Sequence, residues 1–304
     1  MRLEYKILWI ENDSDWKEST EDMIKDEILE KGYILDTTFY KDYNVFLGKT
    51  AKKDYGIYDL ILVDFKLDND LTGDNFIEKV RNNNVLTDVL FYSQNSDELK
   101  DKFSKNSLEG VYISNREDFE DKFFQVFRKT IKKLEELNAV RGLVMAETSR
   151  LDRIIEDILL EHIDSEDKIK IHAIKILEDS AKSLYIDKNK KINERGNLKA
   201  QNIQNNSLIK RALDASKRTR VLAKLIKIKK IDIRFSFESY LEDVIDVRNE
   251  LAHAKSEIKD GKEVLIVEKK EEIEEKEFKQ EDIVEIRKNI LKYDKILKEL
   301  KDKM

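Results

Sequence analysis

The chain has 304 residues with a net charge of -6, and 40% of them are hydrophobic, which suits two domains with ordinary cores. It has no cysteine and three scattered histidines, which excludes disulfides, thiolate catalysis and zinc-thiolate sites and leaves little for a transition-metal site. No apolar run approaches the ~20 residues of a membrane-spanning helix, and the first residues do not resemble a signal peptide, so we expect a cytoplasmic protein without a membrane partner.

The first part of the chain alternates strand and helix patterns. Helical periodicity is visible at 16–31 and 75–82, and further helical segments are expected after the fourth and fifth strands. Strands alternating with helices predict an α/β domain over 1–128, with a doubly wound, five-stranded parallel sheet whose functional edge lies at the carboxyl ends of the strands. The predicted strands are 5–10, 35–39, 59–65, 89–93 and 111–114.

Polar residues stand at the carboxyl ends of three predicted strands. Glu11, Asn12 and Asp13 follow the first strand, Asp64 ends the third, and Ser93 ends the fourth. This constellation resembles the receiver domain of response regulators. The resemblance implies that the acidic residues bind Mg²⁺, that Asp64 accepts a phosphoryl group, and that Ser93 reports the modification. It also implies a sensor kinase or another regulatory protein as partner.

Two positions depart from the family's pattern. Asn12 stands where the resemblance implies a second metal-binding acid, although Asp13 is adjacent. Ser114 stands where it implies a lysine, with Arg116 two residues on. Hard cations prefer carboxylate oxygens, and a transferring phosphoryl group needs a cation at its oxygens. We therefore expect weak Mg²⁺ binding by Asp13 and Asp64 and at best slow phosphorylation. The alternative is a degenerate domain that serves docking or dimerisation.

The second part, 129–304, is predicted to be all-α, a helical bundle with a small β-hairpin. One periodic stretch covers 119–163, and Gly142 inside it indicates close helix packing. The segment 187–206 is polar and predicts a loop, whereas 257–268 predicts the hairpin. Further helices are predicted at 167–185, 207–229, 237–254 and 280–301.

Charge divides unevenly along the chain. Residues 1–130 carry 19 basic and 28 acidic residues, and the remainder carries 39 and 36. The segment Lys210–Lys230 holds nine basic residues against the single acid Asp214. Such a stripe predicts binding to a polyanion such as RNA, and the alternative is a solvated helix face. The residues that we single out for RNA binding are Lys217, Arg218, Arg220 and Lys224.

An arginine and a histidine stand close together near the end of the predicted helix 237–254, in the segment RNELAH. On a helix, Asn249 lies one turn before His253, where its amide can orient the imidazole. Arg248 and His253 are about 140° apart around an ideal helix. One copy therefore does not present both side chains together, whereas a two-fold pair of helices does.

This segment resembles the R-x4-6-H signature of HEPN-domain ribonucleases. The resemblance implies a four-helix bundle, commonly dimeric, that cuts RNA without a metal cofactor, using Arg248 and His253. We add Asn249 to the site because of its position one turn before His253. His253 would act as general acid or base, and Arg248 would neutralise charge on the phosphate in the transition state. The alternative for the motif is that Arg248 pairs with Asp246 or Glu250 and that His253 is favoured by the helix dipole.

These features together predict a receiver-regulated, metal-independent endoribonuclease that acts as a homodimer, as a stress or phage-defence effector. The nuclease needs no cofactor, and Mg²⁺ is expected only in the receiver-like domain. The alternative is a non-catalytic signalling adaptor whose helical domain dimerises and docks a protein or a nucleic acid. A transcriptional regulator on DNA is disfavoured, because no short helix-turn-helix with a glycine-containing turn is visible.

Overall fold

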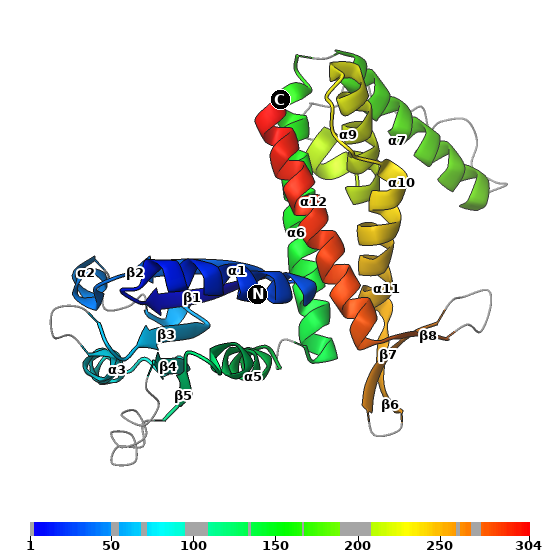
Figure 1. The fold of residues 1–304 in the computed structure, drawn as a ribbon. Coiled ribbons are helices and arrows are strands. Elements are labelled where there is room, and N and C mark those ends of the chain that lie inside the picture. Colours follow the sequence, from blue (N-terminus) through cyan, green and yellow to red (C-terminus); the bar gives the residue numbers. More distant parts are fainter. Residues whose placement is uncertain are drawn as a thin grey trace. The chain divides into compact units, whose positions relative to one another are not determined.

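The structure is a computed structural model of the chain, drawn as a ribbon in Figure 1. It forms two compact units that divide between Val140 and Arg141, whereas the sequence analysis placed the boundary after residue 128. Within the described residues, no helix combines the length and the apolar character that a bilayer crossing requires. The described residues are 3–49, 55–67, 72–94, 109–132, 135–165, 167–188, 208–259, 262–268 and 275–304.

The first unit is built on a five-stranded, all-parallel sheet with the order β2-β1-β3-β4-β5, which confirms the predicted parallel sheet. Every residue of β3 and β4 is buried, as expected for parallel strands that are covered on both faces. The strands are β1 (Glu4–Ile10), β2 (Ile34–Tyr40), β3 (Leu60–Asp64), β4 (Val89–Ser93) and β5 (Val111–Asn115).

Helices pack on the two faces of this sheet. On one face, Phe46 of α2 and Phe76 of α3 join the main core with strand residues such as Val63. On the other face, Phe119 of α5 stacks on Trp9 of β1, and α1 packs beside it. Helix α2 was not predicted, and the helix expected after β4 lies outside the described residues. The helical elements are α1 (Ser14–Glu30), α2 (Tyr43–Lys49), η1 (Tyr55–Ile57), α3 (Gly73–Asn82) and α5 (Phe119–Ile131).

Helix α3 begins in close contact with the carboxyl end of β3. A Cβ atom at Gly73 would lie 2.5 Å from the backbone oxygen of Asp64 and 2.5 Å from Cε2 of Phe91. The backbone N–H of Gly73 also donates to the carbonyl oxygen of Phe65 at 3.1 Å. Only glycine allows this approach, which sets the start of α3 against the functional edge of the sheet.

The second unit consists of helices and a small antiparallel sheet (Figure 1). The periodic stretch 119–163, for which the sequence allowed either one helix or a break near Asn138, is divided into α5 and α6. Gly142 of α6 is exposed, and a Cβ atom placed there would meet nothing within 4 Å, so the predicted close packing is wrong. The helical elements are α6 (Leu137–His162), α7 (Asp167–Lys188), η3 (Leu208–Ala212), α9 (Ala215–Lys229), α10 (Phe237–Tyr240), η4 (Leu241–Asp246), α11 (Val247–His253) and α12 (Gln280–Lys303).

The helix predicted over 237–254 contains a π-helical segment, η4, between α10 and α11. A π turn closes i to i+5 bonds, so it rotates the residues after it relative to a continuous α-helix. Contacts with α12 hold this segment. The Tyr240 and Tyr293 rings lie 4.8 Å apart, edge to face, and the Tyr293 hydroxyl donates to Asp243 at 2.9 Å.

The small sheet has the order β6-β7-β8 and follows α11 directly. Strands β6 and β7 pair antiparallel and form the predicted hairpin, whereas β8 is a third strand that was not predicted. Most of the loop predicted at 187–206 lies outside the described residues. The strands are β6 (Lys255–Lys259), β7 (Lys262–Glu268) and β8 (Glu275–Phe278).

Candidate functional site

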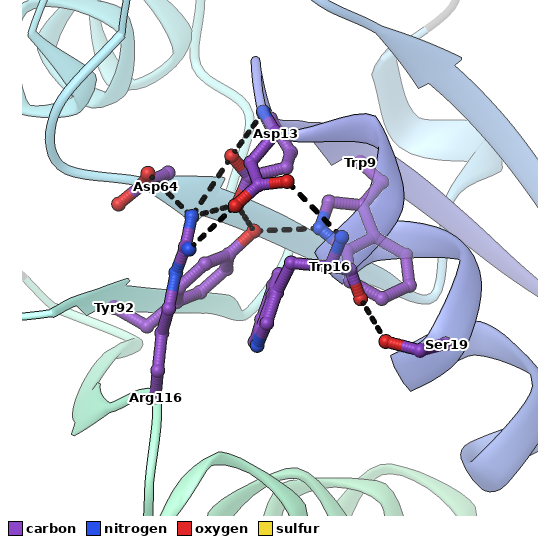
Figure 2. Close-up of polar contacts among 8 residues, drawn as sticks. Trp9, Asp13, Trp16, Ser19, Asp64, Tyr92 and Arg116 are labelled. Carbon is purple, nitrogen blue, oxygen red and sulfur yellow. Dashed lines mark hydrogen bonds and ion pairs between the residues drawn. The ribbon is translucent and has the colours of Figure 1, made fainter.

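Residues that end or follow the parallel strands meet at one edge of the sheet. Glu11 follows β1, Asp64 ends β3, Ser93 ends β4, and Arg116 follows β5. Asp13 joins them as the N-cap of α1, where its side chain accepts a hydrogen bond from the first turn. Figure 2 shows Asp13, Asp64 and Arg116 pointing toward one another. We call the three carboxylates of Glu11, Asp13 and Asp64 the acidic cluster.

The guanidinium of Arg116 contacts every carboxylate of the acidic cluster. Its Nη1 donates to Asp13 Oδ2 at 2.9 Å. Its Nη2 lies 3.1 Å from both carboxylate oxygens of Glu11 and 3.3 Å from Asp64 Oδ2. Its Cζ lies 4.5 Å from the centroid of the Trp16 ring, in cation–π geometry (Figure 2). Arg116 is therefore the cation of the cluster.

Glu11 is the most enclosed member of the cluster, with none of its surface exposed. The Tyr92 hydroxyl donates to its Oε2 at 2.9 Å, and Trp9 Nε1 donates to that hydroxyl at 2.6 Å. The backbone N–H of Asp13 donates to Glu11 Oε1 at 2.8 Å. Burial, and next the charge of Asp64, raise the pKa of Glu11 to about 7. The cluster therefore changes its protonation near neutral pH.

The other two carboxylates are affected in opposite directions. Burial raises the pKa of Asp64, although Arg116 acts against this. The backbone N–H of Trp16, and next Arg116, lower the pKa of Asp13. Ser114, at the position that the resemblance assigns to lysine, is buried, and its hydroxyl has no hydrogen-bond partner among the described residues. The cation comes instead from Arg116, directly after the end of β5.

The predicted Mg²⁺ ligands Asp13 and Asp64 are both engaged by this guanidinium. Mg²⁺ requires oxygen ligands at about 2.0–2.1 Å in near-octahedral geometry. Asn12, between Glu11 and Asp13, adds no charge to attract it. The residues present therefore do not fit a divalent cation while Arg116 lies among them. Ser93, to which the resemblance gives a reporting role, is buried at the end of β4.

The predicted nuclease residues lie on α11, in the second unit. Arg248 donates from Nη2 and Nε to Asn249 Oδ1, at 2.8 and 3.3 Å. The Asn249 amide, which was expected to orient His253, has its oxygen directed to Arg248. His253 is exposed, ends the helix, and makes no hydrogen bond or ion pair with any described residue. Arg248 likewise forms no ion pair within the described part of the chain, so the alternative in which it pairs with Asp246 or Glu250 is not formed.

Arg141 of α6 is a neighbour of this motif that the sequence analysis missed. Its Nη2 donates to the carbonyl oxygen of Ala252 at 2.7 Å, in the last turn of α11. A cation at a helix carboxyl end satisfies a carbonyl that has no partner within the helix and interacts favourably with the helix dipole. Arg141 thereby fixes the end of α11 beside His253. The two residues belong to different helices far apart in the chain, and no local pattern indicates their contact.

Not every basic residue of the stripe on α9 is available to bind RNA in the structure. Arg218 is buried and pairs with Asp152 through Nε and Nη2, and its Nη1 lies 3.6 Å from Glu156. It also donates to two backbone carbonyls of the preceding segment. Arg218 therefore holds α9 against α6, and we remove it from the predicted RNA-binding set. Lys217 pairs with Asp214 at the start of the helix.

Arg220 and Lys224 remain exposed on α9. The Cζ of Arg220 lies 4.8 Å from the centroid of the Phe237 ring. Burial, and next the charges of Lys224, Lys175 and Arg220, lower the pKa of His172 on the neighbouring helix α7. The cations of α7 and α9 thus create a positive field on the helical unit.

The two arrangements differ in what they can do chemically. The acidic cluster is a largely buried network in which one guanidinium contacts three carboxylates, and its Glu11 takes up a proton near neutral pH. The motif on α11 offers an exposed imidazole and a positioned guanidinium, which suit proton transfer and charge stabilisation at a phosphate.

No protein-family model matches the chain, and the search of curated proteins gives no significant match.

Proposed function

We propose that the helical unit is a cytoplasmic, metal-independent endoribonuclease of the HEPN type, which works as a homodimer, and that the receiver-like α/β unit regulates it. The observation that carries this is the exposed imidazole of His253, free of partners among the described residues, close in sequence to an Arg248 guanidinium held by Asn249. Histidine is a common general acid or base in catalysis, and this one is accessible to a substrate.

The cleavage uses the RNA strand's own 2′-hydroxyl. Its oxygen forms a bond to phosphorus while the bond from phosphorus to the 5′-oxygen breaks, which leaves a 2′,3′-cyclic phosphate and a 5′-hydroxyl. The proton leaves the 2′-hydroxyl and one is delivered to the 5′-oxygen, and His253 serves one of these transfers as base or acid. Arg248 stabilises the additional negative charge on the phosphate oxygens in the transition state.

A second copy of the chain completes the site. Helix α11 is α-helical from Val247 to His253, so the offset of about 140° between Arg248 and His253 applies. An isologous pairing places the Arg248 of one copy near the His253 of the other. Strand β6 begins just after His253 at the edge of its sheet, and its Ile258 is 79% exposed, which offers an apolar contact for that copy.

The exposed cations of α9 supply affinity for the RNA strand. Phosphate contacts of this kind are sequence-independent and weaken with salt. The α/β unit acts on the nuclease by docking a partner protein, since Arg116 already contacts every carboxylate of the acidic cluster, where a phosphoryl group would need a free cation.

The assignment is tested by RNA cleavage in EDTA. The wild type is expected to produce fragments that end in a 2′,3′-cyclic phosphate. Arg248→Ala and His253→Ala are expected to lose cleavage at least ~100-fold while they keep the fold and the oligomeric state. His162→Ala, which removes another histidine of the helical unit, is the matched control and keeps activity. Undiminished cleavage by His253→Ala excludes the nuclease, and RNA binding without cleavage by the wild type favours the adaptor.

Mixing the two inactive variants tests the shared site. A heterodimer of Arg248→Ala and His253→Ala holds one complete pair, contributed by both copies. Random exchange then restores about a quarter of wild-type activity, because half of the dimers are mixed and each has one of two sites. No recovery after confirmed subunit exchange shows that the site belongs to one chain.

A further inference from the structure

We propose that Arg116 is the permanent counter-cation of the acidic cluster, so that the α/β unit folds without a divalent cation and its cluster takes up no Mg²⁺. The proposal concerns the first unit and does not depend on the nuclease assignment.

The burial of the cluster makes an internal cation necessary. Glu11 is 0% exposed and Asp64 is 4% exposed, and isolated buried carboxylates are strongly unfavourable unless they are paired and hydrogen-bonded. The guanidinium answers this need with two nitrogens, since Nη1 serves Asp13 and Nη2 faces both Glu11 and Asp64. A planar fork of donors suits several carboxylate oxygens at once, which a lysine ammonium does less well.

The chain holds this cation in place from two sides. The backbone N–H of Arg116 donates to the carbonyl oxygen of Ser93 at 3.1 Å, which continues the pairing of β5 with β4 beyond the strand. The indole of Trp16 then covers the guanidinium at 4.5 Å. A tethered cation competes with ions from solution at a high effective concentration. An incoming Mg²⁺ would have to break both the carboxylate contacts and this stacking.

The remaining hydrogen bonds of the cluster also come from the protein. Tyr92 and the backbone N–H of Asp13 donate to the two oxygens of Glu11, and Trp16 N–H donates to Asp13 Oδ1 at 3.1 Å. A Mg²⁺ site instead needs carboxylate lone pairs facing a common centre and room for the waters that the ion retains. With these oxygens facing protein donors, the cluster is completed by the side chain of Arg116.

The test is a Mg²⁺ titration of the full chain, read by tryptophan fluorescence and calorimetry. Wild type is expected to show no saturable change at millimolar Mg²⁺ and the same melting temperature in Mg²⁺ and in EDTA. Arg116→Ala is expected to bind Mg²⁺ tighter than wild type by about tenfold or more and to gain melting temperature with it. Arg128→Ala, an exposed arginine of α5, is the matched control and behaves as wild type. Adding Asp64→Asn to Arg116→Ala removes the new binding.

A saturable Mg²⁺ response of the wild type equal to that of the variant overturns the proposal. So does a folded Arg116→Ala protein that gains no affinity. If Arg116→Ala folds only when Mg²⁺ is present, the proposal is supported, and if it does not fold at all, Arg116→Gln takes its place. The wild-type melting temperature in EDTA and in Mg²⁺ is decisive without any variant, because a Mg²⁺-dependent rise contradicts a cluster whose counter-cation is Arg116.

Discussion

Glu11 makes the stability of the α/β unit depend on pH in the neutral range. Burial and the charge of Asp64 raise its pKa from the ordinary value of 4.5 to about 7. Between these values the folded chain holds a proton that the unfolded chain has released. The free energy of unfolding therefore falls as pH rises through this window and is level above it. The shift corresponds to about 3 kcal/mol of stability, present at low pH and lost by about pH 7.5.

The substitution Glu11→Gln removes this titration. The amide oxygen still accepts hydrogen bonds from Arg116 and from the backbone N–H of Asp13, so the network keeps most of its contacts. The side chains that face position 11 are the same in both proteins, namely Asp13, Asp64, Tyr92 and Arg116. The difference between the two stability curves therefore reports the titration of Glu11. Relative to the variant, wild type is expected to lose about 2–3 kcal/mol between about pH 5 and pH 7.5.

The assay is urea unfolding followed by tryptophan fluorescence across this pH range. The chain has two tryptophans, Trp9 and Trp16, and both lie beside the acidic cluster, so the signal reports on the α/β unit alone. Glu120→Gln, an exposed acid of α5, is the control and should keep the wild-type slope. Parallel stability curves for wild type and Glu11→Gln would show that Glu11 does not titrate in this range. Wild-type stability that rises with pH relative to the variant would show that its pKa is lowered rather than raised.

Two pairs of substitutions test the packing and the basic face. Gly73→Ala should lower stability by about 1–3 kcal/mol through overpacking, whereas Gly142→Ala, in an open helix position, should raise it by about 0.5–1 kcal/mol in urea unfolding. If both substitutions change the free energy of unfolding equally, the close contact at Gly73 and the open space at Gly142 are contradicted. Arg218→Met should destabilise the helical unit by about 2 kcal/mol without a specific loss of RNA affinity. Arg220→Ala with Lys224→Ala should weaken RNA binding and flatten its salt dependence in anisotropy titrations. If the salt dependence of RNA affinity is unchanged, Arg220 and Lys224 belong to a solvated helix face that does not contact RNA.

Local sequence patterns predicted the parallel sheet and the edge at which its polar residues gather. Short apolar runs separated by helical periodicity indicate parallel strands, and residues that follow such strands must reach one edge. The positions of Glu11, Asp64 and Ser93 at that edge follow from this periodicity alone. The hairpin after α11 could also be predicted from a local pattern, because it depends on two strands joined by a short turn.

The contacts of these residues depend on segments that lie far apart in the chain and could not be predicted from local patterns. Arg116 reaches the acidic cluster because Ser93 and Trp16 direct its backbone and side chain, and neither contact is visible in a local pattern. The burial of Arg218 depends on Asp152 of another helix, so a basic stripe read from α9 alone includes it wrongly among exposed cations.

Contacts with distant segments also hold the helix that carries the RNELAH segment. Its π-helical segment is held by α12 through Tyr293, and its last turn is held by Arg141 of α6. Periodicity along one segment predicts which element forms and roughly which face is polar, because backbone hydrogen bonding is local. The partner of a charged side chain is chosen through space among residues far apart in the chain, and only the packed structure brings those residues together.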